Sequence, residues 1–107
     1  MQRVTLVRYT AKPERAAENE ALARVVFSEL RATSPDHLAY ALFRDGHDFV
    51  HLFVNTEADD SNELTDLPSF KAFAKDVEAR CEAPPQVTRL GLRMLESYGL
   101  TRAMAPA

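Results

Sequence analysis

The chain of 107 residues is the size of one domain with a single hydrophobic core, and its 46% hydrophobic and 27% charged residues are typical of soluble proteins. A formal net charge of −3 argues against nucleic acid and anionic membranes as partners, because neither surface attracts a mildly acidic protein. Cys81 is the single cysteine, no signal peptide is recognisable and no apolar run approaches the roughly 20 residues of a membrane span, so we expect a cytoplasmic protein.

The first part of the chain predicts a strand followed by a helix. Residues 4–10 alternate in polarity and are rich in β-branched and aromatic side chains, which favours a strand. Pro13 suits the first position of a helix, which we expect to end near Ala32, because the residue before Pro35 avoids the helical conformation. The inward stripe of this helix is predicted to contain Leu22, Val25, Val26, Glu29 and Leu30.

Residues 38–55 predict a β-hairpin. Asp45-Gly46 lies between two alternating apolar runs, which is the strongest short signal for a hairpin turn. The turn can pair Arg44 with His47 or with Phe49, and both registers put the same residues on the same faces. One face carries Leu38, Tyr40, Leu42, Arg44, Phe49, His51, Phe53 and Asn55. The other face carries Ala39, Ala41, Phe43, Val50, Leu52 and Val54.

The remainder of the chain predicts a loop, a second helix and a fourth strand. Residues 56–65 form an acidic loop that lacks the ligand spacing of an EF-hand. Residues 68–81 predict a helix with an apolar stripe that ends at Cys81, which we expect to be a buried, inert thiol. Residues 86–98 predict a strand with a bulge near Leu95. The domain is expected to span residues 1–100, with residues 101–107 as a frayed tail.

This order of elements predicts the α+β, ferredoxin-like βαββαβ fold, with a four-stranded antiparallel sheet and both helices on one of its faces. Both faces of the hairpin are largely apolar, although a sheet with one wet face would alternate between apolar and polar residues. The face without helices would then leave a large apolar patch in water. We therefore expect a homodimer that covers this face with a second copy of the sheet.

Residues 3–99 resemble the antibiotic biosynthesis monooxygenase family of dimeric α+β barrel proteins. The similarity is sharpest at FVHL, residues 49–52, and at LPSFKAF, residues 67–73. The family includes cofactor-independent oxygenases that act on phenolic or quinol polyketides, and haem-degrading enzymes. The haem-degrading branch uses an Asn on the first strand, a Trp, and a His on the second helix. This chain has no Trp, offers Arg8 and Tyr9 where that Asn is wanted, and lacks the helical His. The resemblance therefore implies an oxygenase without a cofactor.

His51 and Tyr40 are the candidate catalytic residues, because they are predicted to lie side by side on a face of the hairpin that is otherwise occupied mainly by Leu and Phe. A histidine with a pKa near neutrality beside a phenol could accept a proton from a bound phenol or quinol. The alternative is a core histidine bonded to Tyr40 or to a backbone carbonyl. His37 and His47 are expected to be solvated, and no histidine pair has the spacing of a metal site.

The predicted ligand pocket adds polar and apolar residues of the strands and the second helix to His51 and Tyr40. These are Arg8, Tyr9, Leu42, Phe49, Phe53, Asn55 and Phe73. The leading hypothesis is a cofactor-independent monooxygenase that acts on an aromatic phenol or quinol. The alternatives are a non-catalytic ligand-binding or regulatory protein and an interaction module without a pocket. The sequence leaves open which face of the sheet holds the cavity.

Overall fold

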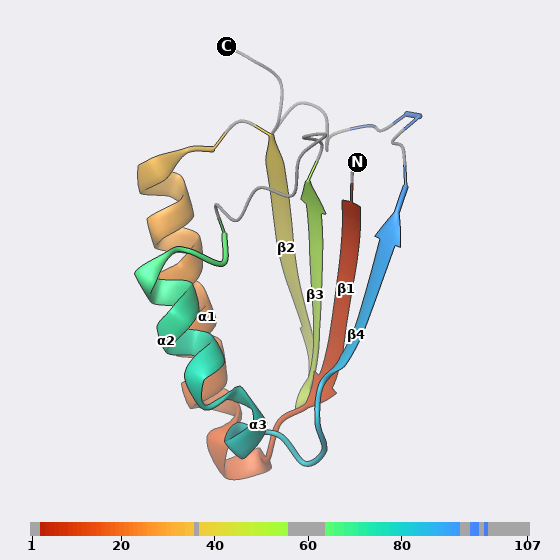
Figure 1. Cartoon of the computed structure of the whole chain (residues 1–107). Coiled ribbons are helices and arrows are strands. Elements are labelled where there is room, and N and C mark those ends of the chain that lie inside the picture. Colours follow the sequence, from red (N-terminus) through yellow and green to blue (C-terminus); the bar gives the residue numbers. More distant parts are fainter. Residues whose placement is uncertain (1–2, 36, 56–63, 93–94, 97, 99–107) are drawn as a thin grey trace.

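The computed structural model describes residues 3–35, 37–55, 64–92, 95–96 and 98 (Figure 1). Its elements are β1 (Arg3–Thr10), the 3-10 turn η1 (Pro13–Arg15), α1 (Ala16–Thr33), β2 (Leu38–Asp45), β3 (Asp48–Asn55), α2 (Pro68–Lys75), α3 (Val77–Arg80) and β4 (Gln86–Gly91). The strands form one antiparallel sheet in the order β2-β3-β1-β4, and α1 and α2 cover the same face of it (Figure 1). The predicted ferredoxin-like fold is confirmed.

The first helix has the predicted ends, and its inward face agrees in part with the prediction. It follows a 3-10 turn that begins at Pro13, and it ends where Ser34 adopts a left-handed conformation with φ of 45°. The buried side chains of α1 are Ala16, Asn19, Ala23 and Val26. Val25, predicted to be buried, is 55% exposed. Val26 is buried and Leu22 and Leu30 pack against the core as predicted, so the prediction was wrong for Val25 alone among the apolar residues of the stripe. It also missed Ala16, Asn19 and Ala23, because it followed the largest apolar side chains.

The hairpin adopts the register that pairs Arg44 with Phe49. Asp45 pairs with Asp48, which leaves Gly46 and His47 to form the turn. Gly46 has φ of 61°, a conformation that glycine adopts without a steric penalty.

The second helix and the last strand are shorter than predicted. Asp76, with φ of −122°, separates α2 from α3, so the single helix predicted over residues 68–81 is wrong. Cys81 is 4% exposed, and burial raises the pKa of its thiol, as expected for an inert cysteine. The last strand ends at Gly91, so Leu95 lies outside the sheet and the bulge predicted there is wrong. Residues 56–63 of the acidic loop and the tail from residue 101 lie outside the described residues.

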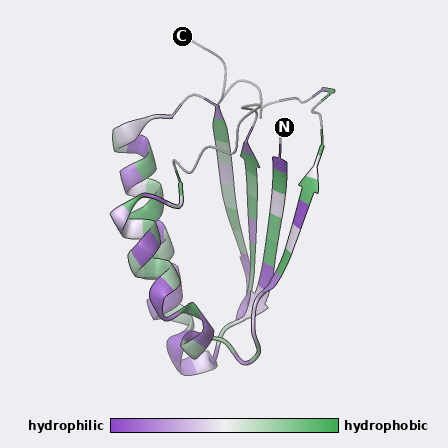
Figure 2. Ribbon diagram, viewed as in Figure 1, coloured by the Kyte–Doolittle hydropathy of each residue, from purple (hydrophilic) through white to green (hydrophobic). Residues whose placement is uncertain are grey.

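The two faces of the sheet differ in their cover. The helix side contains the core, including Tyr9, Leu38, Phe49 and Phe73, whereas helices leave the opposite face open (Figure 1). Strand pairing places apolar side chains of all four strands on this open face, and Figure 2 shows apolar residues along the strands. They are Val4, Leu6, Ala39, Ala41, Phe43, Val50, Leu52, Val54 and Leu90. In the described part of the chain, no helix is long and apolar enough to cross a membrane.

Candidate functional site

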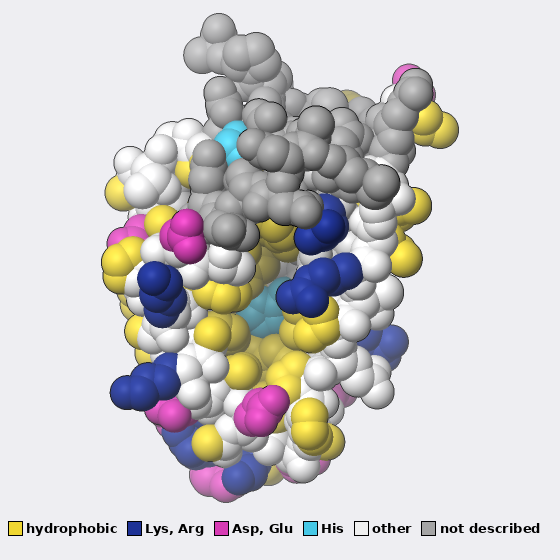
Figure 3. Space-filling model, viewed as in Figure 1, with side chains coloured by type: hydrophobic (Ala, Val, Ile, Leu, Met, Phe, Trp, Pro, Cys, Tyr) yellow, Lys and Arg dark blue, Asp and Glu magenta, His cyan; other side chains and the backbone are white. Residues whose placement is uncertain are grey.

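A cavity of about 520 Å³ lies on the helix side of the sheet. Figure 3 shows it as a hollow with hydrophobic walls and a histidine side chain at its floor, and the histidine that lines the cavity is His51. The strands contribute Arg3, Thr5, Val7, Tyr9, Tyr40, His51, Phe53, Asn55, Val87 and Arg89 to the wall. The other lining residues are Leu64, Thr65, Phe70, Phe73, Ala74, Val77, Glu78 and Pro85. Apolar walls with a few convergent polar groups are typical of small-molecule sites, which usually exceed about 300 Å³.

Two phenols hold the imidazole of His51 on the cavity wall. Tyr40 Oη lies 2.6 Å from His51 Nδ1, and Tyr9 Oη lies 2.7 Å from His51 Nε2. The sheet creates this cluster because β3 lies between β1 and β2, and each tyrosine stands diagonally from His51 on the same face. The Phe73 ring of α2 approaches from the helix side, with its centroid 5.5 Å from that of His51.

Two buried polar residues of the helices extend this cluster. Asn19 of α1 donates from Nδ2 to Tyr9 Oη over 2.8 Å, and Arg80 of α3 donates from Nε to Asn19 Oδ1 over 3.0 Å. Asn19 is fully buried and Arg80 is 1% exposed. Arg80 also donates from Nη2 to the Phe73 carbonyl over 2.6 Å, across the interruption between α2 and α3. The five residues Arg80, Asn19, Tyr9, His51 and Tyr40 therefore form one continuous hydrogen-bonded chain, which we call the polar chain.

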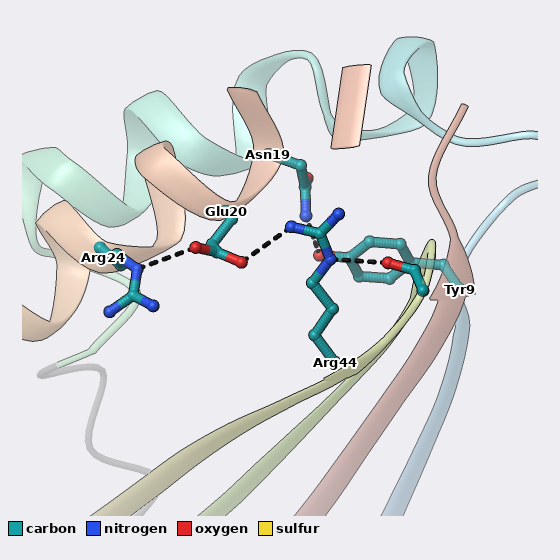
Figure 4. A network of polar contacts seen from close by, with 6 residues as sticks. Tyr9, Asn19, Glu20, Arg24 and Arg44 are labelled. Carbon is teal, nitrogen blue, oxygen red and sulfur yellow. Dashed lines mark hydrogen bonds and ion pairs between the residues drawn. The ribbon is translucent and has the colours of Figure 1, made fainter. Parts of the chain in front are cut away.

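An ion pair joins β2 to α1 one residue along the helix from Asn19. Figure 4 shows Asn19 reaching from α1 toward Tyr9, with Arg44 of β2 beside them. Arg44 Nη1 lies 2.8 Å from Glu20 of α1, and Glu20 also binds Arg24 at 3.1 Å (Figure 4). The contact between Arg44 and Glu20 links β2 to α1.

Burial favours the uncharged forms of His51, Tyr9 and Tyr40. It lowers the pKa of His51 from 6.5 to about 4, because the charged imidazolium would lose its hydration. Burial raises the pKa of Tyr9 to about 12, against the smaller opposing effects of the Asn19 hydrogen bond and the Arg80 charge. It also raises the pKa of Tyr40. The expectation that the pKa of His51 lies near neutrality is therefore wrong, because the apolar surroundings outweigh the two hydrogen bonds.

The structure brings together most of the predicted pocket residues. His51, Tyr40, Tyr9, Phe53, Asn55 and Phe73 line the cavity. Leu42 and Phe49 share the same sheet face but pack in the core outside the cavity lining, and Phe49 is fully buried. The placement of Arg8 in the pocket is wrong, since its neighbour Val7 pairs with His51 and strand alternation puts Arg8 on the opposite face.

Sequence reasoning missed Asn19 and Arg80. A usable signal exists for Asn19, which recurs at helical spacing with Ala16, Ala23 and Val26. Arg80 follows Phe73 and Val77 at similar spacing, but a charged residue is rarely assigned to a core. In the described ranges, no group of three or more His, Cys, Asp or Glu side chains is placed to hold a metal ion.

Comparison with solved structures identifies the same fold in other proteins. A candidate antibiotic biosynthesis monooxygenase from Caulobacter crescentus is 19% identical, with a TM-score of 0.72 over 87% of this chain and 91% of that one. Rv0793 from Mycobacterium tuberculosis is 19% identical, with a TM-score of 0.70 over 91% of this chain and 100% of that one. SnoaB, a cofactor-independent oxygenase from Streptomyces nogalater, is 18% identical, with a TM-score of 0.63 over 88% of this chain and 95% of that one.

At these identities the likeness establishes the fold, and the chemistry must be argued from the site. No protein-family model matches the sequence, and no curated protein is detectably similar to it.

Proposed function

We propose that this protein is a small cofactor-independent monooxygenase that oxidises a hydroxyaromatic molecule, a phenol or a quinol. The observation that carries the proposal is the cavity of about 520 Å³ with Tyr40 and His51 in an otherwise largely apolar wall. Aromatic side chains at the cavity, such as Phe53, Phe70 and Phe73, suit a flat aromatic ligand, and the hydroxyl of Tyr40 can bind the oxygen of that ligand. The shared fold with SnoaB supports the same assignment by analogy.

The proposed reaction draws all its electrons from the substrate. The substrate hydroxyl loses its proton to solvent, and the resulting anion transfers one electron to dioxygen. The radical pair combines at a ring carbon to form a C–O bond, and the peroxide takes up a proton. Loss of water then leaves a carbonyl group, so that a ring CH₂, or its enol tautomer, and O₂ become C=O and H₂O. Tyr40, oriented by its hydrogen bond with His51, would position the oxygen of the anion.

Oxygen uptake tests this function. Purified protein in chelator-treated buffer should consume one O₂ per molecule of a reactive quinol or anthrone, faster than the same substrate without protein. Tyr40→Phe should lower turnover about ten- to a hundredfold, the value of one hydrogen bond to a charged group. Lys71→Ala, on the exposed side of α2, is the matched control and should retain full activity. Saturable binding of the aromatic without oxygen uptake would instead support the ligand-binding alternative.

We also propose that two copies pair through the open face of the sheet. Seven larger apolar side chains lie on this face, and Phe43 is 56% exposed in the single chain. A monomer rarely leaves such a patch in water, whereas a two-fold dimer would cover it with an identical patch. The helix-facing Phe49 and Phe53 do not belong to this surface. The larger hairpin residues that the dimer would cover are Phe43, Val50 and Leu52, whereas Val54 is already buried in the single chain.

Sedimentation tests the dimer. The wild-type chain should sediment at micromolar concentration as a dimer, with twice the chain mass of 12.0 kDa. We expect the dimer interface to bury more than about 1,000 Å² of total surface. Leu52→Asp should produce monomers or aggregates, because an unpaired charge buried in the interface is costly. Ser28→Asp, on the exposed side of α1, should leave the dimer intact. A wild-type protein that sediments as a monomer would rule the dimer out.

A further inference from the structure

Arg80 is a buried cation at the start of the polar chain. Its side chain is 1% exposed, its guanidinium lies 5.0 Å from the centroid of the Phe73 ring, and within the described residues it forms no ion pair. A buried charge is costly unless other groups compensate it. Arg80 meets Asn19 Oδ1 and the Phe73 carbonyl, and both accept hydrogen bonds from it. Buried at this position, the guanidinium needs hydrogen-bond acceptors, and this requirement determines how the side-chain amide of Asn19 is oriented.

Arg80 sets the direction of the hydrogen bonds along the chain. A guanidinium only donates, so the amide oxygen of Asn19 must face Arg80 and its NH₂ group must face Tyr9. Tyr9 Oη then accepts from Asn19, and its own hydrogen is satisfied by donation to His51 Nε2. The hydrogen of the neutral imidazole consequently lies on Nδ1, from which it is donated to Tyr40 Oη.

Tyr40 is therefore left with a hydrogen that points away from His51. In the described ranges its hydroxyl has no hydrogen-bond partner other than His51, and its side chain lines the cavity. Each bond of such a chain polarises the next in the same sense, and the positive charge at the far end makes the last hydroxyl a stronger donor. A preorganised donor in an apolar wall stabilises negative charge on an oxygen in front of it.

We propose that Arg80 and Asn19 are positioning residues that hold His51 as its Nδ1–H tautomer and turn Tyr40 into a donor, so that the cavity binds a hydroxyaromatic molecule as its anion. The part that concerns the ligand rests on the proposed function, because it takes a hydroxyaromatic as the occupant of the cavity. The part that concerns the tautomer rests on the geometry of the five side chains alone. The ligand class is thus an acidic phenol, quinol or enol, and a neutral ether of the same shape should bind more weakly.

The tautomer is tested without ligand or turnover, by ¹⁵N NMR of protein labelled at histidine. At pH 7, His51 should show a protonated Nδ1 and an unprotonated Nε2. In Asn19→Asp the carboxylate still accepts from Arg80 and can only accept from Tyr9, so the bonds from residue 19 to Tyr9, His51 and Tyr40 reverse and the proton of His51 should move to Nε2. Ser28→Asp adds the same charge on the exposed side of α1 and should leave the tautomer unchanged.

The wild-type spectrum can overturn the proposal by itself, even where Asn19→Asp fails to fold. An Nε2–H tautomer in the wild type, or an unchanged tautomer in a folded Asn19→Asp variant, contradicts the assigned direction.

The ligand class is tested with 4-nitrophenol, whose anion has a distinct visible absorption. Bound 4-nitrophenol should be more ionised than the free compound at the same pH, and 4-nitroanisole, which cannot ionise, should bind at least tenfold more weakly. Tyr40→Phe should reduce the excess ionisation while leaving the apolar walls intact. Arg3 and Arg89, which favour an anion, and Glu78, which opposes one, also line the cavity, but this variant leaves all three in place, so the difference reports on Tyr40.

Equal ionisation of free and bound probe, or equal ionisation in the wild type and Tyr40→Phe, would contradict the proposed anion site, as would the absence of binding. These outcomes are independent of oxygen uptake. If the protein ionises the probe but consumes no O₂, the result supports the proposed anion site and contradicts only the proposed oxygenase function.

Discussion

Asn19→Leu should lower the free energy of unfolding by about 2.5–4 kcal/mol. Asn19 is fully buried and joins the Arg80 guanidinium to the Tyr9 hydroxyl, so a leucine of similar size removes a partner from both. A hydrogen bond to a charged group contributes about 1.5–3 kcal/mol, and a buried hydroxyl that loses a partner adds about 1 kcal/mol. Denaturant unfolding of the wild type and the variant would measure this loss, provided that both have the same m-value.

Two further variants separate the buried charge from simple packing. Ser28→Leu makes the same kind of change on the exposed side of α1 and should alter stability by less than about 0.5 kcal/mol. Adding Arg80→Met to Asn19→Leu should recover much of the loss, because the cation is removed together with its acceptor. A loss below about 1 kcal/mol in Asn19→Leu would mean that Arg80 and Tyr9 do not depend on Asn19.

The second large effect is a loss of stability on acidification, from His51. Its pKa is lowered from 6.5 to about 4 in the folded protein, so between these values the unfolded chain binds more protons than the folded one. Stability is therefore full above about pH 6.5, decreases as the pH falls toward 4, and the total loss from this group is about 3 kcal/mol. The physical cause is that the buried site does not hydrate an imidazolium.

Urea melts between pH 7.5 and pH 4.5 measure this effect. In His51→Phe the slope of stability against pH over this window should be much smaller, whereas His47→Gln, in the exposed hairpin turn, should keep the wild-type slope. Hydrogen bonds from Arg15 and Arg44 lower the pKa of Glu18 and Glu20, respectively, so these surface carboxylates affect stability mainly at lower pH. An identical slope in His51→Phe and the wild type would show that His51 titrates normally.

The low pKa of His51 also changes the interpretation of the site. Proton transfer from an ordinary phenol, with a pKa near 10, to a base with a pKa of about 4 costs about 8 kcal/mol. His51 is therefore a poor general base, although it remains well placed to orient Tyr40. The arrangement suits stabilisation of an anion better than abstraction of a proton, and this is the reason to look for acidic hydroxyaromatic ligands.

The sequence by itself determined the element order, the hairpin and the sharing of faces between its strands. These features depend on local chemistry, namely the two-residue period of a strand, the left-handed conformation of Gly46 and the prolines at residues 13 and 68. For the same reason His51 and Tyr40 could be predicted as neighbours, because the distance between them follows from the register of one hairpin.

Only the tertiary structure decided which face holds the cavity and which residues complete the polar chain. Asn19 meets Tyr9 across 10 positions of the chain and Arg80 meets Asn19 across 61, through the docking of helices on the sheet. The rotation of α1 that buries Asn19, and leaves Val25 exposed, depends on how closely small side chains let the helix approach. Periodicity ranks a buried arginine or asparagine as a surface residue, because its partners appear only once the helices are packed.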